Sequence, residues 1–122
     1  TIMENVMLPL TIVSHRNGRQ KKLAYGVLEK VGLAEKAGRL PNQLSGGEQE
    51  RVAVARALVN NPPIILADEP TGNLDSATGN EIMKLLKELN SEGRTIIMVT
   101  HNPENAGFAG RLIRLRDGRI DC

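Results

Sequence analysis

The 122-residue chain has very few aromatic side chains: one tyrosine, Tyr25, one phenylalanine, Phe108, and no tryptophan. Proteins that bind single-stranded nucleic acid without sequence preference stack the bases on aromatic side chains, so a platform of that kind is not expected here. The formal net charge is only +2, and acidic and basic residues are interspersed. A nucleic-acid-binding domain normally concentrates basic residues on one face, so the charge pattern predicts no nucleic-acid partner either.

Cysteine and long apolar runs are equally scarce. The one cysteine, Cys122, ends the sequence, which excludes an internal disulfide, and no spacing of cysteine and histidine suits a metal site. No apolar run approaches the ~18 residues that a membrane-spanning helix needs. The first ten residues include Glu4 and no basic residue, unlike a secretory leader. These absences favour a globular protein in a reducing, cytoplasmic setting.

Apolar spacing divides the chain into helices and strands. We expect helices over residues 1–8, 20–31 and 45–60, and a further helix that ends near Gly93. The first helix should end or kink at Pro9, which lacks an amide hydrogen. Two apolar segments, 64–67 and 95–100, are typical of strands that are buried on both faces of a parallel sheet.

Smaller features refine these elements. In the helix over 20–31 the expected buried stripe comprises Leu23, Val27, Leu28 and Val31, and Gly32 is a good stop signal. Asp117 and Gly118 predict the tight turn of a terminal β-hairpin.

The order strand, helix, strand in residues 64–100 predicts a βαβ unit and therefore an α/β fold with a parallel sheet. Ligands of such sheets bind outside the carboxyl ends of the strands. Asp68, Glu69 and His101 all follow those ends in the sequence. This edge of the sheet is therefore the first candidate site.

Asp68 and Glu69 suit magnesium-dependent phosphoryl transfer. Mg²⁺ is held by one or two carboxylates together with water and phosphate oxygens. A second acid can position or deprotonate the attacking water. An acidic turn after a strand explains the same pair without any function, so these residues alone leave both interpretations open.

A second candidate site lies at the start of the helix over 45–60. Ser45, followed three residues later by Glu48, has the capping-box pattern. Gly46 and Gly47 are poor helix formers, but they expose backbone amides where a helix begins, which suits a phosphate. A simple cap is the alternative, and the two interpretations are compatible. His101 could likewise be only solvated, and Asp75 could be only a helix cap.

Together these residues resemble the ATP-binding subunit of an ABC transporter. The similar motifs are the signature at 44–48, the Walker B strand at 64–69, the D-loop at 72–75 and the switch histidine at 100–101. Their order and spacing also match. Residues 4–10 and 70–76 are most similar to the lipoprotein-release and macrolide-export type.

The resemblance implies a role for each matching residue. Asp68 would hold Mg²⁺, largely through water, and Glu69 would be the general base for the attacking water. His101 would contact the γ-phosphate and stabilise the transition state. Ser45, Gly46 and Gly47, with Glu48 beside them, would contact the phosphates of ATP bound to the opposite subunit of a dimer. Asp75 would lie at the dimer interface and couple the two sites.

The resemblance covers essentially the whole chain. It implies a partial P-loop NTPase domain of the ABC type, in which residues 1–60 form the helical subdomain and residues 61–122 the Walker B, D-loop and switch part of the core. The family's Gly-x-x-x-x-Gly-Lys-Ser/Thr phosphate loop (Walker A) is missing, and we expect it before Thr1. Glu50 stands where the family suggests Gln, and Asn102 where Asp is commoner.

The implied function is ATP binding and hydrolysis that powers an ABC transporter. ATP and Mg²⁺ would be the cofactors, and a second ATP-binding subunit and transmembrane permease subunits the partners, on the cytoplasmic face of the cell membrane. The alternatives are a non-catalytic interaction or regulatory half-domain, and an ABC ATPase of DNA repair or translation. Without a phosphate loop, we expect the chain alone to bind Mg-ATP very weakly, not to hydrolyse it, and to self-associate along the strand over 95–100.

Overall fold

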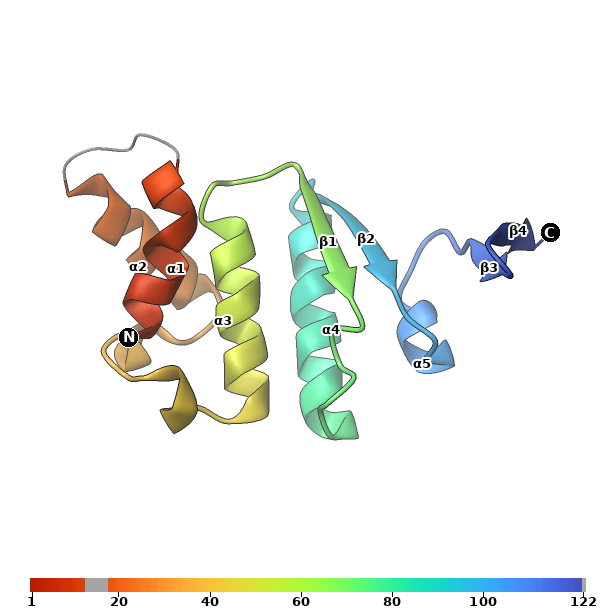
Figure 1. Ribbon diagram of the computed structural model, residues 1–122, viewed down its shortest axis with the longest axis horizontal. Coiled ribbons are helices and arrows are strands. Elements are labelled where there is room, and N and C mark those ends of the chain that lie inside the picture. The colour runs from red at the N-terminus through yellow and green to blue at the C-terminus, as the bar shows by residue number, and fades with distance from the viewer. Residues whose placement is uncertain (13–17, 122) are drawn as a thin grey trace.

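The computed structural model describes residues 1–12 and 18–121, so Cys122 lies outside the described residues. Figure 1 shows the first helices grouped on one side, a long helix beside them, a parallel strand pair against that helix, and a small hairpin at the far end. The elements are α1 (Ile2–Ile12), α2 (Arg19–Lys30), the 3-10 helices η1 (Ala34–Lys36) and η2 (Pro41–Gln43), α3 (Gly46–Leu58), β1 (Ile64–Asp68), α4 (Ser76–Ser91), β2 (Thr95–Val99), α5 (Pro103–Ala106), β3 (Arg114–Arg116) and β4 (Arg119–Asp121).

Helix α1 continues through Pro9 to Ile12, so the expected end near residue 8 is wrong. The proline costs the helix one hydrogen bond, about 3 kcal/mol in a helix interior. Three α1 side chains, Ile2, Val6 and Leu10, are fully buried, and α1 packs against both α2 and α3. Burial of such side chains contributes about 1.5–3 kcal/mol each, which is enough to offset the proline.

Helix α2 buries a slightly different stripe from the expected one. Leu28 and Val31 are buried as expected, but Ala24 takes the place of Leu23, which is 43% exposed. The buried positions i, i+4 and i+7 follow one helical face more closely than the predicted set. Gly32 follows the helix with φ of 77°, which confirms it as the stop signal.

Strands β1 and β2 pair in parallel, with Asp68 opposite Val99 at the carboxyl end. Only one face of this pair is covered. Ile65 is buried on the side of α4, whereas Leu66 is 76% exposed and Ile97 52% exposed on the other side. The expectation of strands buried on both faces is therefore wrong within residues 1–12 and 18–121, because no element in those ranges covers the second face.

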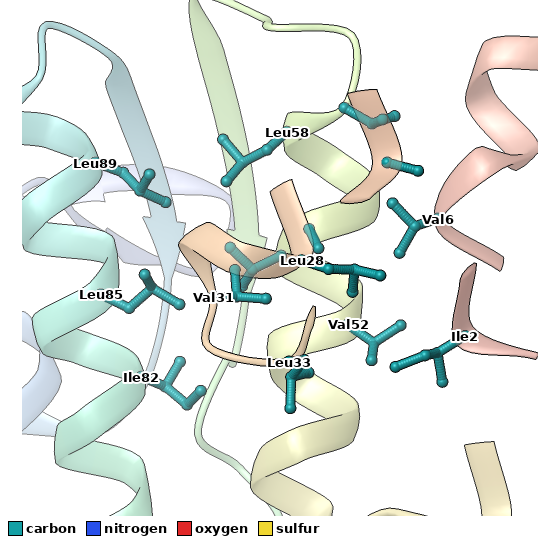
Figure 2. Packing of buried hydrophobic residues seen from close by; sticks show 14 of the residues in the cluster. Ile2, Val6, Leu28, Val31, Leu33, Val52, Leu58, Ile82, Leu85 and Leu89 are labelled. Atoms are coloured by element: carbon teal, nitrogen blue, oxygen red, sulfur yellow. The ribbon is translucent and has the colours of Figure 1, made fainter. Parts of the chain in front are cut away.

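One hydrophobic core joins the helical part to the strand pair. Figure 2 shows Ile82, Leu85 and Leu89 of α4 on one side of this core and Val31 and Leu58 on the other. The buried residues of α3 and α4 face this core. None of the helices in the described part of the chain is long and apolar enough to cross a membrane.

The C-terminal hairpin forms as predicted. β3 and β4 pair antiparallel, and the turn residues Asp117 and Gly118 have φ of 50° and 73°. Positive φ at both central positions is the geometry of the type I′ turn, which matches the twist of two paired strands.

Candidate functional site

Glu69 lies directly after β1 in an unusual backbone conformation. Its φ is 44°, a left-handed value that costs a residue with a side chain about 1–3 kcal/mol. Its amide donates to Val99 O at 2.8 Å, which extends the parallel pairing by one residue. Its carbonyl accepts from the Gly72 amide at 3.1 Å, which closes a tight turn. The chain therefore reverses sharply and presents the Glu69 side chain at the carboxyl edge of the sheet.

The Glu69 carboxylate is bound to the segment that follows β2. Oε1 accepts from the His101 amide at 2.8 Å and lies 2.5 Å from His101 Nδ1. Oε2 accepts from the Thr100 hydroxyl at 3.2 Å. Desolvation acts to raise the pKa of Glu69, but these donors outweigh it and hold the pKa below its ordinary value. The carboxylate is therefore ionised at neutral pH and able to accept a proton.

The strand register explains why these groups meet. Asp68 is opposite Val99, so the next residues along, Glu69 and Thr100, are opposite each other. Sequence reasoning assigned no role to the Thr100 hydroxyl, although a parallel pairing of the two apolar segments would have indicated this contact. The His101 side chain is 92% exposed. Because Nδ1 faces Glu69, Nε2 is left for a ligand at the open edge.

Asp68 is exposed at the same edge. Within the described residues, no group of three or more His, Cys, Asp and Glu side chains gathers as a metal site. A single hard carboxylate still fits Mg²⁺, which keeps several waters and takes further oxygens from a phosphate substrate. The chemistry of Asp68 therefore fits a metal ion that arrives with a phosphate ligand.

The capping box at the start of α3 is present as the sequence predicts. Ser45 Oγ accepts from the Glu48 amide at 3.2 Å, and the Ser45 amide donates to Glu48 Oε2 at 3.0 Å. Lys36 Nζ contacts the other oxygen of Glu48. The lysine first, and the Ser45 amide next, lower the pKa of Glu48. Glu48 therefore acts here as a structural cap.

Gly46 and Gly47 occupy the first two positions of α3, where helix geometry supplies no intrahelical acceptor for the amides. Both glycines lie close to the start of α4. A Cβ atom on Gly47 would come within 2.2 Å of Thr78 Cγ2, and one on Gly46 within 3.3 Å of Leu74 Cδ2. A side chain at Gly47 would force Thr78 or one of the helix starts to shift, whereas one at Gly46 would need only a small displacement of Leu74.

Asp75 caps α4 by accepting from the Thr78 amide at 3.2 Å. The Thr78 hydroxyl, followed by the Thr78 amide, lowers the pKa of Asp75. The structure thus brings Leu74 and Thr78, which lie on either side of Asp75 in the sequence, close to the glycines that begin α3, and separately brings Glu69 beside His101. Within the described part of the chain, no hydrogen bond or ion pair joins these two groups.

Asn105 is a further residue at this edge that sequence reasoning missed. It lies on α5, is only 5% exposed, and its Nδ2 donates to Thr71 Oγ1 at 2.6 Å. No local pattern indicated it, because its partner lies 34 positions earlier in the chain.

Comparisons with known proteins all find similarity to ABC transporter proteins. The sequence model of the family described as ABC transporter matches residues 1–72. An uncharacterised ABC transporter ATP-binding protein of Methanocaldococcus jannaschii, MJ1508, is 53% identical over 120 residues, which are 98% of this chain and 54% of that protein. A macrolide export ATP-binding/permease protein, MacB, of Chlorobium luteolum is 55% identical over 98% of this chain and 18% of its own length.

The chain is also similar to solved structures of an ABC transporter cassette. The dimeric structure of MJ0796, a bacterial ABC transporter cassette, matches with a TM-score of 0.84 and 52% identity, over 100% of this chain and 55% of the cassette. A dimeric post-hydrolysis state of MJ0796 bound to ADP and Pi matches with a TM-score of 0.84 and 50% identity, over the same shares of the two chains. The chain thus spans about half the length of MJ1508 and of the solved cassette.

Proposed function

Because the chain belongs to the ABC transporter family and is similar to its ATP-binding proteins, we propose that it is part of a subunit that hydrolyses ATP to power a transporter. The observation that carries this proposal is the Glu69 carboxylate. Thr100 and His101 hold it at the carboxyl edge of the sheet, where α/β proteins bind their ligands. Asp68 is exposed beside it.

In the proposed reaction Glu69 accepts a proton from the water that attacks the γ-phosphate. Its lowered pKa keeps it ionised at neutral pH, and its hydrogen bonds from Thr100 and His101 hold it in one place. His101 directs Nε2 toward the transferred phosphoryl group. Asp68 would hold Mg²⁺, largely through water, and the ion would supply positive charge to neutralise the phosphates.

The start of α3 is proposed to act on a second nucleotide. The amides of Gly46 and Gly47 and the Ser45 hydroxyl would bind the phosphates of ATP held by a partner subunit, since helix starts favour anions. Glu48 would contribute as the cap that holds this start in place. Asp75 would lie at the interface and couple the two sites. The similarity to cassettes solved as dimers supports this arrangement.

The proposed partners are a second ATP-binding subunit and a transmembrane permease, which would place the protein on the cytoplasmic face of the membrane. The MacB relatives support this, since their name joins an ATP-binding part to a permease. We propose that residues 1–60 form the helical subdomain and residues 61–122 the Walker B, D-loop and switch part of the core. No finding favours a non-catalytic half-domain, or an ATPase of DNA repair or translation.

Replacing Glu69 by glutamine in the complete subunit tests the proposal. The amide cannot accept the proton, so turnover should fall by about 10²–10⁴-fold while ATP binding is preserved. Glu88→Gln, an exposed change on α4, is the matched control and should leave turnover unchanged. Undiminished ATPase activity in Glu69→Gln would contradict the assigned role.

A further inference from the structure

Asn105 is the one polar side chain that the fold buries within residues 1–12 and 18–121. A buried amide without a partner costs about 1–3 kcal/mol, so its hydrogen bond to Thr71 is strongly held. The Nδ2 to Oγ1 distance is 2.6 Å. This bond joins α5, which follows β2, to the turn that follows β1.

Thr71 belongs to the same turn as Glu69. The Gly72 amide donates to Glu69 O at 3.1 Å, so Thr71 lies between the two ends of that bond. Thr71 also lies against the first turns of α4, where a Cβ atom on Gly79 would come within 3.3 Å of Thr71 Cβ. Holding Thr71 therefore holds the backbone that carries Glu69.

A second series of hydrogen bonds connects the helix that carries Asn105 to Glu69. Asn102 Oδ1 accepts from the Glu104 amide at 2.8 Å and so caps α5. The Asn102 amide donates to Thr100 Oγ1 at 3.0 Å, and Thr100 donates to Glu69 Oε2 at 3.2 Å. Together with the intervening chain, these hydrogen bonds form a closed ring. It runs from the Glu69 backbone through Thr71, Asn105 and the start of α5 to Thr100, and returns to the Glu69 carboxylate.

We propose that Asn105 is a positioning residue that closes this ring and fixes the Glu69 carboxylate against Thr100 and His101. The inference rests on the proposed function of Glu69 as base. Without the bond to Thr71, the remaining hydrogen bonds between the turn after β1 and the segment after β2, within the described residues, are those of the Glu69 carboxylate. Because Asn105 is only 5% exposed and its side chain bonds to Thr71, its loss should change the placement of the base and leave the binding of ATP intact.

The test uses the complete subunit and steady-state ATPase kinetics. Asn105→Leu and Thr71→Val each remove the hydrogen bond while nearly preserving volume. Each should lower kcat by about tenfold, since small misplacements of a reacting group have effects of this order. KM for ATP should stay within about twofold, because ground-state binding is unchanged. The double variant should be no slower than either single variant, since both remove the same bond.

Two further variants separate positioning from general destabilisation. Thr71→Ser keeps the hydroxyl and should retain wild-type kcat. Asn80→Leu, an exposed asparagine change on α4, should also be neutral. Thermal melts identify any variant that fails to fold; if Asn105→Leu is one of them, the comparison of Thr71→Val with Thr71→Ser decides.

Wild-type kcat in Asn105→Leu, or equal losses in Thr71→Ser and Thr71→Val, would overturn the positioning role. The ATPase activity of Glu69→Gln tests the proposed function independently of the role of Asn105. An active Glu69→Gln variant refutes the proposed function, whereas an inactive one beside a fully active Asn105→Leu refutes only the role of Asn105.

Discussion

Replacing Gly47 by alanine should destabilise the fold, although alanine is the better helix former. The new Cβ would lie 2.2 Å from Thr78 Cγ2, well inside contact distance. Thr78 cannot easily turn away, because β-branched side chains have few rotamers in a helix. Overpacking costs about 1–3 kcal/mol. The gain in helix propensity is at most about 1 kcal/mol and is smaller in the first turn, so we expect a net loss of about 1–2 kcal/mol.

The chain offers a matched control and a rescue. Gly26 lies within α2, and a Cβ atom there would meet nothing within 4 Å. Gly26→Ala should therefore stabilise the protein by about 0.5–1 kcal/mol. Thr78→Ala removes the obstructing methyl but keeps the amide that Asp75 accepts from. Combined with Gly47→Ala, it should recover about 1 kcal/mol relative to the sum of the two single changes.

Urea unfolding followed by far-ultraviolet circular dichroism measures these differences, since the chain has no tryptophan for fluorescence. The variants should differ in the unfolding midpoint and share a similar slope. A Gly47→Ala variant as stable as wild type, or a double variant with no recovery, would show that the starts of α3 and α4 do not pack as described.

Two further predictions concern the 122-residue chain by itself. Calorimetric titration with Mg-ATP should show no micromolar binding, because the chain contains no phosphate loop to hold the β- and γ-phosphates; a micromolar affinity would contradict this reasoning. Sedimentation velocity should show self-association that Ile97→Lys reduces, because Ile97 is 52% exposed on the uncovered face of an edge strand and an added charge there opposes pairing. Leu23→Lys, at a 43% exposed position of α2, is the control, and an equal effect of both changes would rule out the strand as the contact.

Much of the local structure could be predicted from the sequence. The cap of α3 by Ser45 and Glu48 depends on residues three positions apart, and the stop at Gly32 depends on one residue that tolerates positive φ. The hairpin turn at Asp117 and Gly118 follows the same logic. The candidate acids were also found, because an apolar strand that ends in carboxylates is visible without any partner.

The sequence by itself therefore determined the main helices and strands, apart from the end of α1, and the edge of the sheet at which Asp68, Glu69 and His101 lie. Their catalytic and binding roles stay predictions until the variants are measured. These features depend on interactions between neighbours along the chain or on the rule that parallel strands end together.

Only the tertiary structure decided which surfaces meet. It showed that packing against α2 and α3 carries α1 through Pro9, and that one face of the strand pair is left uncovered. It also showed that Gly47 faces Thr78 and that Asn105 reaches back to Thr71. Each of these outcomes depends on segments far apart in the sequence, whose approach is set by burial across the whole core, and no local pattern encodes such a pairing.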